Sequence, residues 1–269
     1  MRRLVHLSDL HFGRDRPELL EPLLAAVRAA RPDLVAISGD LTQRARARQF
    51  RHARAFVDRL EAPCLVVPGN HDVPLDRPLT RLLDPWGAWR AWFGPELEPE
   101  FRDAEMVVIG VNTVNPLSWQ RGRIGRRALR RIRRAFEAEP ADGRSRILVA
   151  HHPFEQEAGI DKKLMHGARG AVGVLAECGA DIVLTGHLHA WAAAPFARRE
   201  GRAGVVQVRA GTGLSNRLRG EENDFNLLTL ERDAVTVERF AATDGVFRPA
   251  AVARFRSGGG GWAVQEGEV

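Results

Sequence analysis

The chain has 269 residues, of which 44% are hydrophobic and 28% are charged, and its formal net charge is +6. These values are typical of a soluble globular protein with one large α/β domain. No apolar run approaches the roughly 18 residues that a membrane helix needs, so the sequence excludes a transmembrane segment.

Nearly all the cations are arginine, with lysine only at Lys162 and Lys163. Together with the abundant alanine, this bias indicates a GC-rich genome as much as a nucleic-acid partner. The charge argues only weakly for anionic substrates, and we expect no specific nucleic-acid partner.

Two features indicate the cellular compartment. Cys64 and Cys178 each lie beside an apolar run, which favours buried free thiols in a reducing cytosol over a disulfide. The segment from Met1 to His6 enters a strand pattern at once and leaves no room for a signal peptide. We therefore expect a cytoplasmic protein.

The first third of the chain alternates strands with helices. Buried strands are predicted over residues 3–8, 34–38 and 64–67, and amphipathic helices over residues 17–30 and 43–60. This order calls for parallel strands with helices on the outside.

Residues 74–103 are less regular. Trp86, Trp89 and Phe93 have the spacing of one helix face, and we expect them to pack on the sheet. The alternatives are a lid over the site or a contact in a homodimer.

A strand over residues 105–111 is followed by a very basic helix over residues 125–138. Leu129, Ile132 and Phe136 form its inner stripe, which places the arginines on the outer face. We expect that face to be merely solvated. A peripheral contact with anionic phospholipid stays open as the alternative.

The rest of the chain changes from mixed to all-strand patterning. Two strands, 147–150 and 182–185, flank a short helix over 171–178, and no helix is predicted after them. The later strands form either a second, antiparallel sheet or a continuation of the first. We expect one domain over residues 1–256 and a flexible, glycine-rich tail over 257–269. The predicted later strands are 193–198, 203–209, 226–231, 234–240 and 246–255.

Polar side chains of the kinds that bind metals follow five buried strands, each at the point where the strand ends. In an α/β sheet, the loops at the carboxyl ends of parallel strands converge in one crevice. Any one of these motifs would be ordinary loop chemistry, but packing gives no reason for all five together. The residues are Asp9 with His11, Asp40, Asn70 with His71, His151, and His187 with His189.

The donor types indicate which ions would bind. Oxygen and imidazole donors without thiolate suit Mn, Fe or Zn rather than a structural zinc cluster. Seven ligands are too many for one transition metal, but they fit two ions if one carboxylate bridges them.

The five motifs resemble those of the calcineurin-like metallophosphoesterase superfamily. They are Asp9-x-His11, Gly39-Asp40, the tetrad Gly69 to Asp72, His151-x-Pro153 and Gly186-His187-x-His189, and the resemblance covers roughly residues 1–240. The compact length and the final motif look most like class III cyclic nucleotide phosphodiesterases. The Asp-Arg-Gly motif of the Ser/Thr protein phosphatases is absent, which disfavours that branch.

The resemblance implies a fold and a set of roles. The fold is a four-layer αββα sandwich, in which two central mixed sheets are flanked by helices. Asp9, His11, Asp40 and His189 would hold one metal, and Asp40 would bridge to a second ion held by Asn70, His151 and His187. Matching to the motif selects His151 as the ligand, and His152 would line the pocket or pack beneath it.

The predicted function is a dinuclear-metal-dependent phosphodiesterase acting on small diesters such as 3′,5′-cyclic nucleotides, by attack of a metal-bridging hydroxide on phosphorus. Asn70, His71 and His152 would contact the substrate, and His71 is the candidate catalytic acid. Asp72 would orient a histidine or stabilise its own turn.

Other functions stay open. They are a phosphomonoesterase, a glycerophosphodiesterase, a lipid-linked pyrophosphate hydrolase resembling UDP-diacylglucosamine hydrolases, and a non-catalytic scaffold. A scaffold is disfavoured because the chain keeps all seven ligands.

Overall fold

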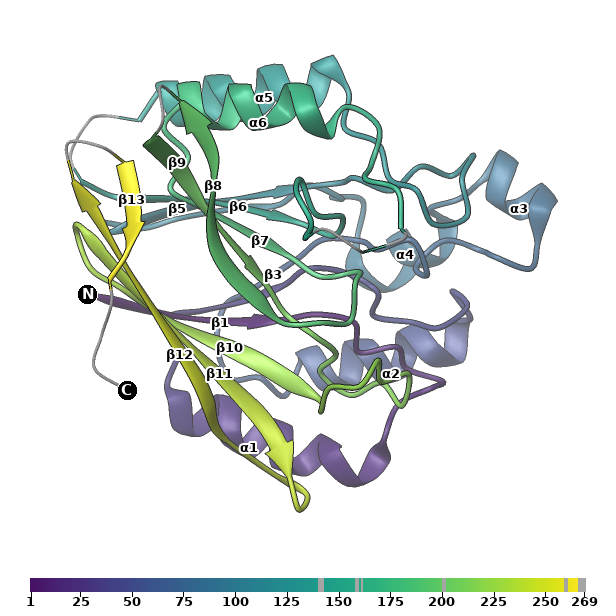
Figure 1. Cartoon of the computed structure of the whole chain (residues 1–269). Helices are drawn as coiled ribbons and strands as arrows, with labels where there is room; N and C mark the ends of the chain where they lie inside the picture. Colours follow the sequence, from purple (N-terminus) through teal and green to yellow (C-terminus); the bar gives the residue numbers. More distant parts are fainter. Residues whose placement is uncertain (140–142, 158–159, 161, 200–201, 259–260, 266–269) are drawn as a thin grey trace.

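Two mixed β-sheets face each other, and helices cover the outer face of each sheet (Figure 1). This computed structural model describes all residues except 140–142, 158–159, 161, 200–201, 259–260 and 266–269. The layered arrangement confirms the predicted αββα sandwich.

The first sheet has a parallel half and an antiparallel half, in the order β13-β12-β11-β10-β1-β2-β3. β1, β2 and β3 run parallel, and β10 pairs antiparallel with β1. The strands are β1 (Arg2–Leu7), β2 (Leu34–Ile37), β3 (Cys64–Val66), β10 (Asp224–Leu230), β11 (Ala234–Thr243), β12 (Val246–Gly258) and β13 (Gly261–Val264).

The second sheet has the order β4-β5-β6-β7-β9-β8, with four parallel strands between two antiparallel edge strands. The late strands are therefore divided between the sheets, because β8 and β9 complete the second while β10 to β13 extend the first. The strands are β4 (Glu100–Arg102), β5 (Met106–Val111), β6 (Ser145–Ala150), β7 (Ile182–Thr185), β8 (Ala192–Arg199) and β9 (Arg202–Arg209).

The expected flexible tail is wrong for residues 261–264. These residues form β13, which pairs with the end of β12, and Trp262 is buried between the two sheets. Its indole nitrogen donates to Asp181 Oδ1 at 3.3 Å. The glycine run suggested a flexible tail, but it is followed by a strand that pairs with β12. The buried side chain of Trp262 holds that strand in place. Residues 259–260 and 266–269 of the predicted tail lie outside the described residues.

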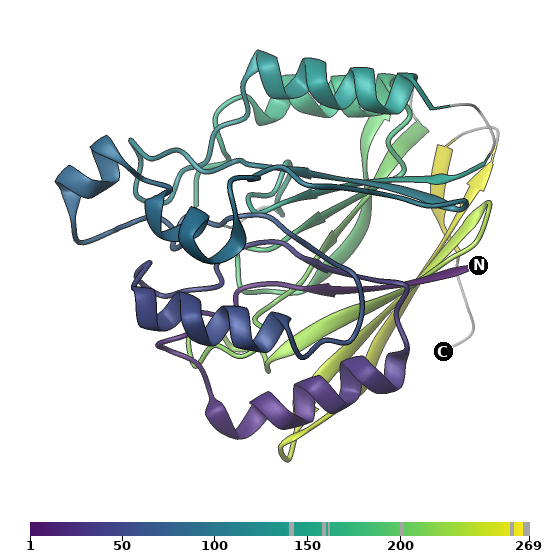
Figure 2. The ribbon, with the colours of Figure 1, turned by 180° about the vertical axis from the view of Figure 1, so that it is seen from behind.

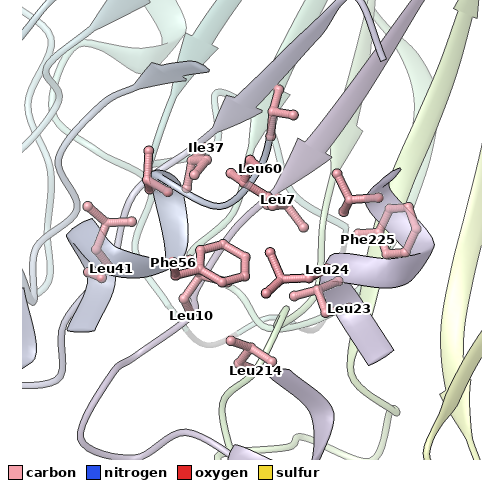
Figure 3. Close-up of a cluster of buried hydrophobic side chains, with 14 of the residues drawn as sticks. Leu7, Leu10, Leu23, Leu24, Ile37, Leu41, Phe56, Leu60, Leu214 and Phe225 are labelled. Carbon is pink, nitrogen blue, oxygen red and sulfur yellow. The ribbon is translucent and has the colours of Figure 1, made fainter. Parts of the chain in front are cut away.

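Strand alternation divides the core into three layers. Leu7 and Ile37 face α1 (Leu20–Ala30) and α2 (Ala47–Val57), and Figure 3 shows them near Leu23, Leu24 and Phe56. A second cluster fills the space between the sheets, and a third lies under α5 (Arg126–Glu137) and α6 (Ala168–Glu177). Figure 2 shows the two helix pairs on opposite sides of the sheets.

The basic helix α5 packs as its pattern predicts. Ile132 and Phe136 are fully buried, and Leu129 is partly buried against the same cluster. Arg131 binds Glu98 at 3.2 Å and Glu100 at 2.7 Å, so part of its cationic face is paired. Among the described residues, no helix is both long and apolar enough to cross a bilayer.

The irregular segment contains two short helices, α3 (Pro78–Leu83) and α4 (Gly87–Phe93). Trp89 and Phe93 share a face of α4 and stack with ring centroids 5.0 Å apart. Both rings contact Phe50 of α2, so this face packs on a helix as well as beside the edge of the sheet.

A polar cluster interrupts the apolar layer between the sheets. His6 of β1 is fully buried, with Nε2 2.9 Å from Ser38 Oγ and Nδ1 3.4 Å from Asn226 Nδ2. Burial lowers the pKa of His6 to about 3. The folded protein therefore keeps this imidazole neutral at pH values where the unfolded chain would protonate it.

His6 should make the protein less stable in mild acid. Its folded pKa lies below its unfolded value of about 6.5, so stability is lost as pH falls through that range. At pH 5 the expected loss from this group is roughly 2 kcal/mol relative to pH 7, from 1.36 kcal/mol per pKa unit. Urea unfolding of the wild type and of His6→Gln at both pH values, with EDTA present throughout, measures the difference. An equal pH dependence in the two proteins would contradict the assignment.

Candidate metal centre

The seven predicted metal ligands meet at one point, where strands of both sheets end. They follow β1, β2 and β3 of the first sheet and β6 and β7 of the second, whose carboxyl ends face the same side of the molecule (Figure 1). Every one of the seven side chains is buried, at most 7% exposed. Packing alone gives no reason to bury this many carboxylates and imidazoles together.

Asp9, His11 and His189 form one half of the cluster. Asp9 Oδ1 lies 3.1 Å from His189 Nε2 and 3.4 Å from His11 Nε2, and the two Nε2 atoms are 3.3 Å apart. His189 Nδ1 donates to the carbonyl of Arg217 at 3.0 Å, which leaves a lone pair on Nε2. Within the described chain Asp9 Oδ1 accepts no hydrogen bond. The carboxylate oxygen and the imidazole nitrogens thus face one another with free lone pairs, an arrangement that suits a metal ion.

Asp40 lies between the two halves. Its Oδ2 is 3.6 Å from His11 Nε2 and 3.4 Å from His151 Nε2, so one carboxylate oxygen is close to imidazoles from different sheets. Its Oδ1 accepts the backbone N–H of His71 at 2.8 Å. This is the position that a bridging carboxylate requires.

Asn70, His151 and His187 form the other half. His151 Nε2 lies 3.1 Å from Asn70 Oδ1 and 3.3 Å from His187 Nδ1. His151 Nδ1 donates to the carbonyl of Ser38 at 2.8 Å, which fixes the ring and leaves Nε2 to bind a metal. The donors of this half are again oxygen and imidazole nitrogen, which suit a second ion.

The backbone at the ligands is strained. Positive φ values occur at nine non-glycine residues of the described chain, and five of these are predicted ligands. Such conformations are uncommon for non-glycine residues and cluster at functional sites. The five are Asp9 (φ 52°), His11 (47°), Asp40 (52°), His187 (71°) and His189 (58°).

Glycines before the ligands allow the loops to approach closely. A Cβ on Gly186 would lie 1.8 Å from Ser8 Oγ, and one on Gly69 would lie 2.2 Å from the backbone nitrogen of Asp40. Because these neighbours are backbone or buried groups, no larger residue fits at either position.

Asp72 stabilises the turns rather than a histidine. Its carboxylate accepts the backbone N–H groups of Leu41 at 3.1 Å, Thr42 at 2.8 Å and Gly69 at 2.9 Å. It therefore ties the loop of Asp40 to the loop of Asn70, which decides between the two predicted roles.

The charges of the cluster depend on one another. Burial opposes ionisation of Asp9 and Asp40, but the surrounding imidazoles outweigh it and hold the pKa of both carboxyls well below the usual range. Burial likewise opposes a charge on His151, yet Asp40 raises its pKa to about 9. The two carboxylates are thus held ionised, as metal binding requires.

His71 lies at the edge of the ligand cluster, with its ring centroid 4.8 Å from that of His11. Its Nδ1 donates to the carbonyl of Gln43 at 2.9 Å, and its Nε2 lies 3.3 Å from Arg217 Nη1. Burial lowers the pKa of His71 to about 4. A neutral imidazole and a permanent cation therefore stand side by side at the mouth of the site.

His152 packs behind the ligands. Its Nε2 donates to the carbonyl of Gln120 at 3.0 Å, so its Nδ1 accepts from the Thr113 hydroxyl at 2.8 Å. Burial lowers the pKa of His152 to about 3. Its ring centroid lies 4.6 Å from that of His187, so it supports that ring.

The sequence analysis missed three groups at the site. Lys162 Nζ donates to the carbonyl of His187 at 2.7 Å, Arg217 contacts His71, and the side chain of Trp119 is exposed beside both. The one signal in the sequence was that Lys162 and Lys163 are the only lysines in an arginine-rich chain.

Two grooves leave the metal cluster and share Trp119 and Gln120. One, of about 720 Å³, reaches His71 and carries Arg14, Arg44 and Arg217. The other, of about 600 Å³, reaches His187 and carries Arg121, Lys162 and Lys163. Both grooves are cationic and thus suit an anionic substrate.

The chain matches the calcineurin-like phosphoesterase family over residues 2–191 and so belongs to this family. Its buried His and Asp side chains form groups whose ligand atoms lie close enough together to hold metal ions.

Solved structures agree on the fold. A purple acid phosphatase from yellow lupin seeds gives a TM-score of 0.72 at 16% identity, covering 92% of this chain and 52% of that one. A dimetal phosphatase from Danio rerio gives 0.66 at 14% identity, covering 92% and 98%.

Two curated relatives match a shorter part of the chain. The glycerophosphodiester phosphodiesterase GpdQ of Enterobacter lignolyticus is 33% identical over 81 residues, which are 26% of this chain and 29% of that protein. The 3′,5′-cyclic adenosine monophosphate phosphodiesterase CpdA of Escherichia coli is 31% identical over 81 residues, or 26% and 30%. Each match spans less than a third of the relative's length.

Asp40→Ala should lose both metal ions, because it removes the carboxylate that lies between the two halves of the cluster. Metal analysis of the purified variant, after loading with Mn²⁺ and desalting, measures the loss. Asp58→Ala, which removes an exposed carboxylate on α2, is the matched control and should keep the wild-type content. Two ions per chain in Asp40→Ala would show that this carboxylate does not bridge.

Proposed function

We propose that the protein is a phosphodiesterase for small diesters such as 3′,5′-cyclic nucleotides, working with two bound ions of the Mn, Fe or Zn type. The observation that supports a diester is the pair of grooves. A linear phosphodiester carries two ester arms and a monoester only one, and each groove offers space to one arm. In a 3′,5′-cyclic nucleotide both ester oxygens belong to one ribose, so the nucleoside would occupy one groove. The exposed indole of Trp119, between the grooves, is suited to stack on a nucleobase.

The ligands proposed for the two ions are those that the resemblance implies. Asp9, His11 and His189 would hold one ion, Asn70, His151 and His187 would hold the other, and Asp40 would be shared between them. When bound, such ions supply an activated water and neutralise charge on the phosphoryl oxygens.

Residues of the chain itself bind and orient the substrate. Arg217 directs a guanidinium at the space beside His71, where it neutralises a non-bridging phosphoryl oxygen. The amide of Asn70 contacts the same phosphoryl group while its oxygen is held near His151. The phosphorus would thus lie at the metal cluster, with the organic part of the substrate in one groove for a cyclic diester and in both for a linear one.

His71 is proposed as the group that protonates the leaving oxygen. Its Nδ1 proton is donated to the carbonyl of Gln43, so Nε2 has a lone pair, which accepts from Arg217 Nη1 at 3.3 Å beside the substrate groove. Proton donation requires a second proton on Nε2, and the low pKa of the imidazole makes it a strong acid once protonated.

The names of the two curated relatives support diester chemistry, since one is a glycerophosphodiester phosphodiesterase and the other a cyclic adenosine monophosphate phosphodiesterase. A glycerophosphodiester is therefore the second candidate substrate. The exposed indole of Trp119 in both grooves favours a nucleotide, whose base can stack on it, over a glycerol diester, which has no aromatic ring.

A hydrolysis panel tests the proposed function. Mn-loaded protein should hydrolyse bis(p-nitrophenyl) phosphate and cyclic AMP faster than p-nitrophenyl phosphate, and glycerophosphocholine is the competing diester. EDTA should abolish turnover and Mn²⁺ should restore it. A monoester hydrolysed faster than every diester would overturn the diester assignment.

His71→Ala should keep the metal content and reduce the rate. General acid help is typically worth about 10²–10⁴-fold, and a nitrophenolate leaving group needs little protonation. The loss should therefore be large on cyclic AMP and small on bis(p-nitrophenyl) phosphate, as measured by kcat/KM on both substrates. Equal losses would show that His71 stabilises charge instead of donating a proton.

A further inference from the structure

Helix α3 exposes its apolar residues and buries its cation. Leu79, Leu82 and Leu83 are 73%, 63% and 80% exposed, whereas Arg81 is 8% exposed. The spacing i, i+3, i+4 puts the three leucines on one face of the helix. This is the reverse of the pattern expected for a helix on the surface of a globular protein.

The arrangement is held in place by Arg81. Its guanidinium donates to three carbonyls, of Pro74 at 3.1 Å, Pro116 at 2.6 Å and Ser118 at 2.5 Å. These bonds tie α3 to the segment 115–119, which forms part of both grooves. The leucines are therefore exposed on a helix that hydrogen bonds fix to the rest of the fold, and not on a frayed chain segment.

The same segment exposes two more large apolar side chains, Leu117 at 80% and Trp119 at 72%. Half of the ten exposed large hydrophobic residues in the described chain thus lie on α3 and this segment. We call these five residues the apolar tip. Figures 1 and 2 both show α3 projecting beyond the sheets at the end where the parallel strands stop.

Cations lie beside Leu117 and Trp119 of the apolar tip. The groove that contains Leu117 and Trp119 is also lined by Arg121, Lys162 and Lys163, and no described residue lining it is acidic. The two carboxylates that flank α3 in the sequence are neutralised by ion pairs. Asp76 pairs with Arg46, and Asp84 pairs with Arg90 at 3.1 Å.

We propose that the apolar tip docks on the surface of an anionic lipid bilayer. Leucine and tryptophan side chains on a short projecting element insert into the headgroup boundary, and the cations beside Leu117 and Trp119 bind lipid phosphates. Docking would place the mouth of the metal centre at the membrane surface.

Charge and size argue against a second copy of the chain as the occupant. Two facing tips would bring the cations of both copies together, and two six-residue helices bury far less than the roughly 800 Å² per partner of a stable interface. The arginine helix α5 is a poorer lipid-binding element, because it exposes no large apolar side chain and Arg131 and Arg133 bind acidic residues.

Vesicle co-sedimentation of the 269-residue chain tests the proposal. Vesicles of equal parts phosphatidylglycerol and phosphatidylcholine should bind the wild type, and pure phosphatidylcholine should bind it much less. The variant L79S/L82S/L83S should bind the anionic vesicles roughly tenfold or more weakly. The matched control V246S/V252S removes two exposed valines from β12 and should bind like the wild type.

Several results would overturn the proposal. These are no binding of the wild type to anionic vesicles, equal binding by the leucine variant, or loss of binding in R126Q/R127Q/R130Q with the leucine variant unaffected. A dimer of the wild type in light scattering that the leucine variant lacks, without vesicle binding, would identify a second copy as the occupant.

The docking assay involves no turnover, so it is independent of the proposed phosphodiesterase function. Hydrolysis of bis(p-nitrophenyl) phosphate without vesicles should be the same in the wild type, the leucine variant and the control. Equal rates show that the leucine variant is folded, whatever the substrate preference proves to be.

Discussion

The carboxylate of Asp40 lies between imidazoles that belong to different sheets, and the arrangement of the fold serves to keep these groups together. Its oxygen Oδ2 is 3.6 Å from His11 and 3.4 Å from His151. Holding it there requires a left-handed backbone at Asp40 and at four other ligands, which costs about 1–3 kcal/mol at each residue. That total is comparable with the whole stability of a typical domain, about 5–15 kcal/mol. The three apolar layers on both sides of the sheets must offset it.

The metal ligands could be predicted from the sequence because the residues immediately before each ligand identify its position. Each ligand directly follows a buried strand, and strand ends can be recognised from apolar runs and glycine alone. Parallel strands bring the ligands of each sheet to one edge, and the packing of the two sheets then brings residues as distant as Asp9 and His189 together. The sandwich itself came from the resemblance, since apolar patterning left open whether the later strands formed a second sheet or extended the first. The later strands are divided between the two sheets. β9 pairs with β7 of the second sheet, whereas β10 pairs with β1 of the first.

The features that the sequence did not reveal depend on tertiary contacts. Arg217 and His71 are 146 positions apart and meet only because the loop before β10 crosses the site. Trp262 follows a glycine run that reads as a tail, yet it is buried between the sheets. Arg81 looks like any surface arginine, and its burial becomes clear only from three carbonyls that lie on two separate segments.

The hydrogen bonds around the ligands show that other residues of the protein orient them. Ser38 orients His151, the carbonyl of Arg217 orients His189, and Asp72 joins the loops of Asp40 and Asn70. In such a site the unpaired acceptors destabilise the metal-free fold, and bound ions remove that cost because they bind the folded state alone. The acceptors that would destabilise the fold without metal are therefore the groups that provide the affinity for metal ions. Mutation of an orienting residue should thus weaken metal binding through geometry, even where every ligand remains.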